Sequence, residues 1–559
     1  MKRMLWMAIA LAMCAETLAQ PGGRENVQNV VLTARATSPI SYGGETRAQG
    51  RSYNFTPTFF IYPDTKLDQG GAYRLLEELA IQPLLDSTYG TAVVINPTGD
   101  KYAADADFDV FVKLFDMNRG PGNLKVIGLG QGSTFVNQVI APRAGDHVAG
   151  IMSVGGKAGK SVNAAGVPAY VAGKGAAKAA KPYQTANAAH ADEPLLRVVV
   201  NPSENTSLKD LFADAWKQVL GRNYRYNNYR HTHYDGSQFG KYGSYELEPY
   251  LDLDLEPMGI KRIVTEFPVG PARPLAKDTP KWLWYEYWPE ELLEGAPAHS
   301  VPVMVLLHGN TNDPRTQAET SGFIQLAAEE RFFVVEMEWQ GSPNYETMGH
   351  DGVESTLYML FAKYPQLDPS RVYAEGLSAG SITATALGIK KSHVFAGVGG
   401  ESGALFGGLP RNGYATAESL MNEAVQKRGA VETAYCSVFG TMDTVVPYMT
   451  PENWKGNSYL NAWNAYELMN GMEVVSEMDF GRYPLFGQAV RDRETIRTNK
   501  GDGITMETGQ LYKGDVPLIK LVAVMEYGHW NFVPAARVMW DFFKHYSRDP
   551  ETRRLVYTP

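Results

Sequence analysis

Three residues in the C-terminal half of the chain have the types and local sequences that acyl transfer requires. Ser378 lies in a Gly-x-Ser-x-Gly motif over 376–380, Asp443 follows it, and His529 comes last. A hydroxyl group is a weak nucleophile until a base removes its proton and a carboxylate holds that base in place. Nucleophile, acid, base is a chain order in which such triads occur. We therefore predict that these side chains meet and act in those three roles.

The sequence around each of the three residues suits its role. A short strand is expected over 371–375, directly before Ser378, and small residues over 382–389 are typical of a helix packed closely on a sheet. Asp443 and His529 each follow an apolar run that is typical of a buried strand. The alternatives are a serine at an ordinary strand-to-helix turn and an aspartate that caps a helix.

The oxygen that becomes negative during acyl transfer needs backbone N–H groups already directed at it. Ala379, directly after the nucleophile, is one expected donor of this oxyanion hole. The loop after the strand 301–307 should supply the other, which we assign to Asn310. Three aromatic side chains could line a substrate pocket: His308, Trp339 and Trp530. For the two tryptophans, ordinary packing in the core is the alternative.

The two halves of the chain follow one plan of alternating strands and helices. In the second half, the continuous apolar run 301–307 is typical of a strand buried on both faces. In the first half, strands are expected over 58–62, 92–95 and 124–127, the last running into the glycine-rich turn 128–132. Alternation of this kind predicts an α/β fold with mostly parallel sheets, and its repetition predicts two tandem domains.

The two halves differ where the chemistry would occur. Gly130 stands where the second half has Ser378, and Pro63 stands where it has His308. We therefore predict that the first copy is degenerate and cannot perform the chemistry of the second. An unrelated α/β or β-rich accessory domain is the alternative.

Two stretches between the copies have unusual compositions. The segment 157–192 is rich in alanine, glycine and lysine and is interpreted as a loop or poorly ordered insertion. The segment 222–250 carries many tyrosines, which we interpret as linker residues that pack on both neighbouring domains, with sugar stacking as the alternative. The predicted domains are 20–222 and 258–559, joined by a tyrosine-rich linker over 223–257.

Composition limits the possible classes of function. A chain of 559 residues is too long for one ordinary core, and 44% hydrophobic and 20% charged residues are typical of a globular protein. A net charge of −9 without a basic cluster argues against a nucleic-acid partner. The acidic runs 105–109 and 252–254 lack the pattern of a calcium loop, so we predict no metal and no cofactor, and expect the first run to cap a helix.

The first residues have the features of an export signal. Basic residues 2–3 precede the apolar run 4–13, which is too short to span a bilayer, and Ala19 offers a cleavage site. We expect a soluble secreted or periplasmic protein without a membrane span, with lipidation at Cys14 as the alternative. Cleavage would leave Cys436 as the single cysteine, which we interpret as a buried strand residue.

The second half resembles the secreted polyhydroxybutyrate depolymerase-like esterases, a group of α/β-hydrolases that includes feruloyl and acetylxylan esterases. The resemblance covers roughly 259–559 and implies an α/β-hydrolase fold there, with Ser378, Asp443 and His529 as the triad. Together with the repeated plan of the first half, it predicts two tandem α/β-hydrolase-like domains. The chain departs from the family at Asn310, where cysteine is frequent, and at Ser381, where glycine is frequent. The segments that carry the resemblance are 307–310, 367–373, 376–381, 395–398, 440–447 and 528–530.

These observations predict a secreted serine esterase that works through an acyl-enzyme. Feruloyl or acetyl esters of polysaccharide are the expected substrates, so the partner would be polymeric or oligosaccharide-linked. The alternatives are a polyhydroxyalkanoate or polyester depolymerase, a secreted serine peptidase of the same fold, and a non-catalytic carbohydrate-binding protein.

Overall fold

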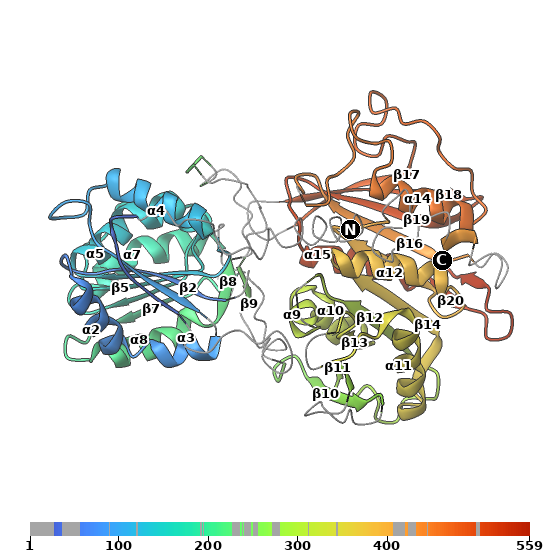
Figure 1. Cartoon of the computed structure of the whole chain (residues 1–559), viewed down its shortest axis with the longest axis horizontal. Coiled ribbons are helices and arrows are strands. Elements are labelled where there is room, and N and C mark those ends of the chain that lie inside the picture. Colours follow the sequence, from blue (N-terminus) through green and yellow to red (C-terminus); the bar gives the residue numbers. More distant parts are fainter. Residues whose placement is uncertain are drawn as a thin grey trace, which may run out of the picture.

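The computed structural model describes most of both predicted domains (Figure 1). The predicted export signal and most of the tyrosine-rich segment lie outside the described residues, so those interpretations remain predictions. The described residues are 27–35, 56–88, 90–118, 121–190, 193, 195–225, 235–237, 239, 247–249, 255–270, 280–310, 312, 314–341, 345–405, 420–422, 432–443, 445–498 and 504–559.

The first domain is built on a seven-stranded sheet with the order β1-β3-β2-β4-β5-β6-β7. All neighbouring strands are parallel except β1 and β3, which are antiparallel. The strands are β1 (Val30–Arg35), β2 (Thr58–Tyr62), β3 (Thr91–Ile95), β4 (Leu124–Leu129), β5 (Gly150–Val154), β6 (Ala169–Ala172) and β7 (Val198–Asn201).

Helices cover both faces of this sheet, which explains the continuous apolar strands. Successive strand side chains point to opposite faces, so Phe59 packs in one buried cluster and Phe60 in the other. The cluster around Phe59 includes buried residues of α2 (Gln69–Leu79) and α8 (Leu208–Ala215). The cluster around Phe60 includes residues of α4 (Ala106–Met117), α5 (Gln131–Phe135) and α7 (Ala176–Asn187), and a short helix α3 (Gln82–Thr88) precedes β3.

The second domain is built on a ten-stranded sheet with the order β10-β11-β13-β12-β14-β15-β16-β19-β18-β17. The six strands from β13 to β19 in this order are parallel, and the flanking pairs are antiparallel. The strands are β10 (Ile260–Pro268), β11 (Lys281–Pro289), β12 (Val301–Leu307), β13 (Phe333–Met337), β14 (Leu367–Gly376), β15 (Gly397–Glu401), β16 (Ala434–Gly440), β17 (Arg491–Arg497), β18 (Thr505–Lys513) and β19 (Val516–Val524).

This sheet is also buried on both faces. Along β12, Val303 and Val305 pack in one cluster, whereas Met304 and Leu306 pack in the other. The first cluster includes residues of α11 (Gly349–Lys363), α12 (Ala379–Lys390) and α14 (Ser458–Met469). The second includes residues of α9 (Pro314–Thr320), α10 (Phe323–Glu330) and α15 (Val533–Phe543). The short strand pairs β20 (Tyr546–Arg548) with β21 (Leu555–Tyr557), and β8 (Asn223–Arg225) with β9 (Leu247–Pro249), complete the described elements of sheet.

The two sheets share one arrangement of strands. The order β1-β3-β2-β4-β5-β6-β7 corresponds to β11-β13-β12-β14-β15-β16-β19, and strand directions agree throughout, including the antiparallel first pair. The prediction of two α/β-hydrolase-like domains with mostly parallel sheets is therefore confirmed. The second domain adds β10, β17 and β18 at the two edges of its sheet.

Two sequence-based interpretations of the first domain need correction. The segment 157–192 is not an unstructured insertion, because β6 and α7 lie within it and bury residues in the core. Its alanines favour a helix, and the short apolar strand before them was hidden among glycines. In the acidic run, Asp105 precedes α4 but makes no capping bond, and its carboxylate instead pairs with Arg143. Asp107 and Asp109 do lie in the first turn of α4, where the helix dipole favours negative charge, as expected for the run.

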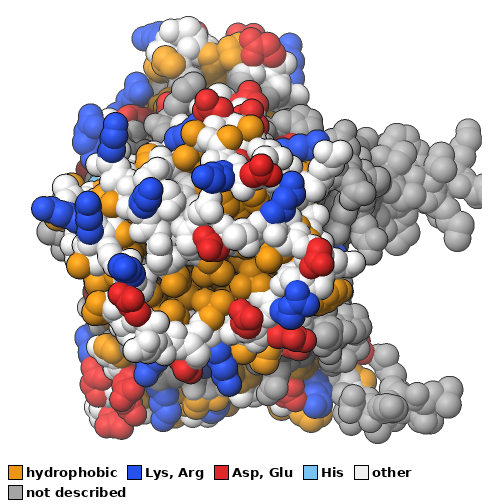
Figure 2. Space-filling view, turned by 90° about the vertical axis from the view of Figure 1, so that its left-hand side faces the viewer, with side chains coloured by type: hydrophobic (Ala, Val, Ile, Leu, Met, Phe, Trp, Pro, Cys, Tyr) orange, Lys and Arg blue, Asp and Glu red, His pale blue; other side chains and the backbone are white. Residues whose placement is uncertain are grey.

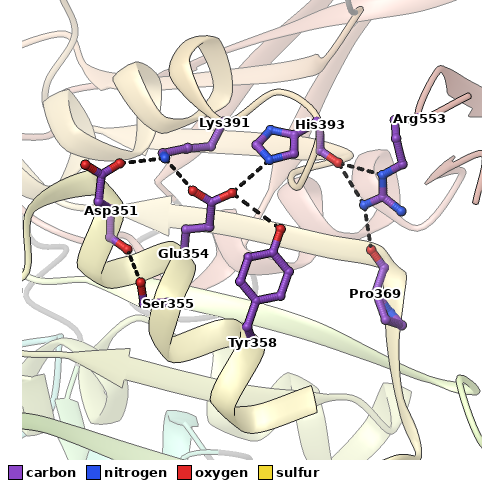
Figure 3. Close-up of polar contacts among 8 residues, drawn as sticks. All are labelled: Asp351, Glu354, Ser355, Tyr358, Pro369, Lys391, His393 and Arg553. Carbon is purple, nitrogen blue, oxygen red and sulfur yellow. Dashed lines mark hydrogen bonds and ion pairs between the residues drawn. The ribbon is translucent and has the colours of Figure 1, made fainter. Parts of the chain in front are cut away.

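Two other observations concern the surface and the chain end. Lys391 at the end of α12 pairs with Asp351 and Glu354 of α11, and Arg553 donates to the backbone carbonyl of His393 (Figure 3). The ion pairs of Lys391 join α12 to α11, and Arg553 joins the C-terminal segment to the loop that follows α12. Within the described residues, no helix combines the length and apolar character needed to cross a bilayer, and no group of three or more His, Cys, Asp or Glu side chains could hold a metal ion.

Candidate active site

Ser378 occupies a strained turn between β14 and α12. Its backbone has φ 54° and ψ −113°, a conformation that a residue other than glycine adopts only where the surrounding structure enforces it. Its N–H donates to the carbonyl oxygen of Glu401 at 2.8 Å. A Cβ atom on Gly380 would lie 1.9 Å from the Leu307 carbonyl oxygen, so glycine is required for α12 to start against the end of β12. The turn therefore presents the hydroxyl at the carboxyl edge of the sheet.

The three residues predicted from sequence form one chain of hydrogen bonds. His529 Nε2 lies 2.9 Å from Ser378 Oγ, and His529 Nδ1 lies 2.8 Å from Asp443 Oδ2. The other carboxylate oxygen of Asp443 accepts from the backbone N–H groups of Val445 at 2.8 Å and Val446 at 2.9 Å. A carboxylate in this position accepts a hydrogen bond from the Nδ1–H group, and this tautomer leaves Nε2 able to accept a hydrogen bond from the Ser378 hydroxyl. Asp443 is 5% exposed and His529 6%, so water competes little for these bonds.

Backbone contacts hold the loop that carries His529, residues 526–532, which we call the base loop. The Glu526 N–H donates to Thr441 Oγ1 at 2.8 Å, and the Met442 N–H donates to the Tyr527 carbonyl oxygen at 2.9 Å. A Cβ atom on Gly440 would lie 2.3 Å from that same Tyr527 oxygen. The loops that present the carboxylate and the imidazole are therefore packed directly on each other.

The two predicted oxyanion donors, Ala379 and Asn310, differ in how closely the structure places them to the nucleophile. Ala379 is the first residue of α12, so its N–H has no partner within the helix. The loop after β12 also reaches this place, because a Cβ on Gly309 would lie only 3.5 Å from Ser378 Cβ. Asn310 is exposed, and its side-chain oxygen accepts from Gln340 Nε2 at 3.2 Å. The loop is therefore close enough to carry the second donor, and its assignment to Asn310 stays a prediction.

The three aromatic residues predicted for a pocket are buried. His308 has no exposed surface, and its ring nitrogens lie 2.9 Å from the Gly309 carbonyl oxygen and 3.2 Å from Glu338 Oε1. Trp339 donates to the His308 carbonyl oxygen at 2.9 Å, and Trp530 is 5% exposed within a core cluster. In this structure His308 and Trp339 brace the loop after β12, and a direct contact of any of the three with substrate stays a prediction.

The first domain keeps the same turn without the nucleophile. Gly130 has φ 52° and ψ −110°, close to the values at Ser378. Its N–H donates to the Val154 carbonyl oxygen at 2.8 Å, as the Ser378 N–H does to the end of β15. A Cβ on Gly132 would lie 2.1 Å from the Tyr62 carbonyl oxygen, which matches the close approach at Gly380. The backbone of the turn at Gly130 therefore matches that of the turn at Ser378, as the spacing of glycines predicted.

A carboxylate fills the place of the missing hydroxyl. Asp64 Oδ1 accepts from the Gln131 N–H at 2.7 Å, and Gln131 holds the position that Ala379 holds in the second domain. A Cβ on Gly130 would lie 2.0 Å from that same oxygen. The residues after β6 and β7 begin with Gly173 and Pro202, where the second domain has the segments of its acid and base. Among the described residues, the places that correspond to the serine, acid and base of the second domain therefore hold other residues.

The side of the molecule that the first domain forms in Figure 1 shows hydrophobic side chains gathered in a central hollow bordered by charged ones (Figure 2).

Sequence reasoning missed a buried pair of acids behind the nucleophile turn. Glu375 ends the apolar part of β14 and is fully buried, and Glu401 at the end of β15 is 1% exposed. Burial raises the pKa of Glu375 to about 8. Burial and the neighbouring Glu375 raise the pKa of Glu401 well above its ordinary value. The sequence did contain one signal for this pair, because Glu375 is an acidic residue in an otherwise apolar strand next to the Gly-x-Ser-x-Gly motif.

No family model and no curated protein sequence matches this chain. Its fold is similar to that of solved hydrolases. An acetyl xylan esterase from Aspergillus awamori is 14% identical, with a TM-score of 0.32, over 50% of this chain and 99% of that one. The feruloyl esterase module from Clostridium thermocellum is 11% identical, with a TM-score of 0.32, over 51% and 88%. An acylaminoacyl peptidase is 15% identical, with a TM-score of 0.28, over 41% and 38%. Likenesses of this size do not indicate what this chain acts on.

The buried Glu375 predicts a measurable effect of pH on stability. Because its folded pKa is about 8 against an ordinary 4.5, the folded chain holds a proton that the unfolded chain loses across this interval. The contribution of Glu375 to the free energy of unfolding should therefore fall from about pH 4.5 to pH 8 and then level off. Glu375→Gln should remove this loss. The difference in free energy of unfolding between the variant and the wild type should therefore shift in favour of the variant by on the order of 3 kcal/mol between pH 5 and pH 8. Urea unfolding at several pH values measures it, and an advantage that does not change with pH would contradict the assignment.

Because the Asp64 carboxylate occupies the turn at Gly130, we expect the effects of substitutions at these two positions on stability to be coupled. Gly130→Ser should lower the free energy of unfolding by about 1–2 kcal/mol, because the new Cβ displaces the carboxylate from the Gln131 N–H. The same change should cost less in an Asp64→Ala background. A double-mutant cycle from urea unfolding gives the coupling energy, and strictly additive effects would show that the two residues do not share this space.

Proposed function

We propose that this chain is a serine hydrolase of carboxylic esters and that its second domain holds the active centre. The observation that carries the proposal is the continuous chain from Ser378 Oγ through both ring nitrogens of His529 to Asp443. The strained turn at the half-buried Ser378 and the N–H of Ala379 support it, because acyl transfer also needs an accessible nucleophile and a donor for the oxyanion.

The geometry supports a two-step reaction. Ser378 Oγ attacks the ester carbonyl carbon while His529 Nε2 takes the hydroxyl proton, and Asp443 stabilises the resulting imidazolium. The carbonyl oxygen becomes negative and accepts hydrogen bonds from the Ala379 N–H and from the loop after β12. The C–O bond to the alcohol then breaks as His529 returns the proton to the leaving oxygen. Water, deprotonated by the same imidazole, attacks the acyl-enzyme and releases the acid and the free serine.

The substrate class that we propose is feruloyl or acetyl esters of polysaccharide. This rests on the family resemblance of the second half and on the predicted export signal, since a secreted esterase meets polymeric substrates. A panel of methyl ferulate, acetylated xylan, polyhydroxybutyrate and dipeptide amides separates the candidates by kcat/KM. We expect the first two to be hydrolysed fastest. Preference for the polyester or the amides would replace this substrate class with the depolymerase or the peptidase.

Removal of the nucleophile should abolish hydrolysis of a short-chain nitrophenyl ester. Ser378→Ala should lower kcat by about 10³-fold or more, and Asp443→Asn by about 10²- to 10⁴-fold, because the latter leaves the imidazole in the wrong tautomer. Ser355→Ala is a matched control, since Ser355 is an exposed serine on α11 that bonds only to its own helix at Asp351. A rate that does not respond to Ser378→Ala would refute the mechanism and favour a binding protein.

A further inference from the structure

We propose that Glu375 and Glu401 are positioning residues that hold His529 against Ser378, and that they do so while at least one of them is a neutral acid. The inference rests on the proposed function, because it concerns the same nucleophile and base. Neither glutamate lies in the chain of hydrogen bonds that performs the chemistry, so both would act through the residues that they contact.

Both glutamates are attached to the nucleophile turn. Glu375 lies three residues before Ser378, at the end of β14. Glu401 ends β15, and its carbonyl oxygen accepts the Ser378 N–H at 2.8 Å. Leu377 and Glu401 also form a parallel bridge. The side chains of the pair therefore start from the two strands that define where the hydroxyl lies.

The same side chains reach the base loop. Gln317 of α9 donates from Nε2 to Glu375 Oε2 at 3.2 Å and to Asn531 Oδ1 at 3.1 Å. The Asn531 amide donates back to Gln317 Oε1 at 3.1 Å, and Tyr527 closes the base loop by donating to the Asn531 carbonyl oxygen at 2.6 Å. Glu401 Oε1 accepts from the N–H of Phe532 at 3.4 Å. Phe532 is thus bonded directly to Glu401, and Asn531 is linked to Glu375 through the side-chain amide of Gln317.

The surroundings of the pair oppose a double negative charge. Both carboxyl groups are buried, and each raises the cost of ionising the other. In the described part of the chain, no lysine or arginine forms an ion pair with either of them. The titratable groups on the elements packed around them are Glu336 on β13, Cys436 on β16, Lys520 on β19, Tyr527 in the base loop, and the ion pair of Arg315 with Glu319 on α9.

A neutral acid in this place has a specific consequence. While at least one of the two carboxyl groups keeps its proton, Gln317 and the Phe532 N–H can hold the base loop close to the nucleophile turn. When both carboxyls ionise, their repulsion acts between β14 and β15, the strands on either side of the turn, and the 2.9 Å contact between His529 Nε2 and Ser378 Oγ should lengthen. Turnover should then fall at alkaline pH, although substrate binding does not involve these groups.

The test is the pH dependence of kcat and KM for a nitrophenyl butyrate between pH 6 and pH 10. The wild type should lose kcat by about tenfold, reversibly, above about pH 8, with KM changed by less than about twofold. Glu375→Ala should lower kcat by about tenfold already at pH 7, because Gln317 loses its partner. Glu375→Gln should recover most of that loss and should lack the alkaline decline, and Glu401→Gln should also weaken the decline.

Glu467 provides a matched control. It is a buried glutamate on α14, burial raises its pKa to about 7, and it accepts from the Val475 N–H, away from the turn and the base loop. Glu467→Gln should therefore keep the alkaline decline of the wild type. Near-ultraviolet circular dichroism at each pH shows that the variants stay folded.

Each outcome of the series decides between the proposals. An alkaline decline that persists unchanged in both Glu375→Gln and Glu401→Gln, or wild-type kcat in Glu375→Ala, would overturn the positioning role. A decline that disappears equally in Glu467→Gln would also overturn it, since general stability would then be the cause. Activity that survives Ser378→Ala would overturn the proposed function itself, whatever the glutamate variants show.

Discussion

The contact between His529 Nε2 and Ser378 Oγ is the interaction on which the account of this protein depends. It joins residues 151 positions apart in sequence, so no local preference of the chain can create it. It exists because β14, β16 and β19 run parallel, and parallel strands bring their carboxyl ends to one edge of the sheet. The acid and the base then follow neighbouring strands, and direct packing of their loops at Gly440 sets the distance between them.

The same edge of the first domain has the same turn without a serine. The turn at Gly130 keeps its unusual backbone angles, which indicates that the sheet and the following helix impose the turn whether or not a nucleophile is present. The carboxylate of Asp64 accepts a hydrogen bond from the N–H of the exposed Gln131, which would otherwise bond to water. The same oxygen lies where a side chain at position 130 would begin, so this carboxylate and a serine cannot both occupy the turn.

The sequence predicted the parts of the fold and site that depend on local patterns. Strands 301–307 and 58–62 were recognisable as continuous apolar runs because both faces of their sheets are covered, and the triad was recognisable because its order and flanking glycines are restrictive. The segment 157–192 was misjudged because alanine and glycine favour opposite structures and only the tertiary core selects between them. Glu375 and Glu401 were missed because their significance lies in what surrounds them, not in their spacing.

Stoichiometric labelling by a fluorophosphonate tests the central claim most directly, because only a serine activated by a neighbouring base reacts with it at useful speed. The account predicts that one phosphonyl group is attached per chain, that peptide mass spectrometry places it on Ser378, and that His529→Ala slows the reaction by about 10²-fold or more. A label on another residue, or labelling of Ser378 at an undiminished rate without His529, would contradict the proposed interaction between the two.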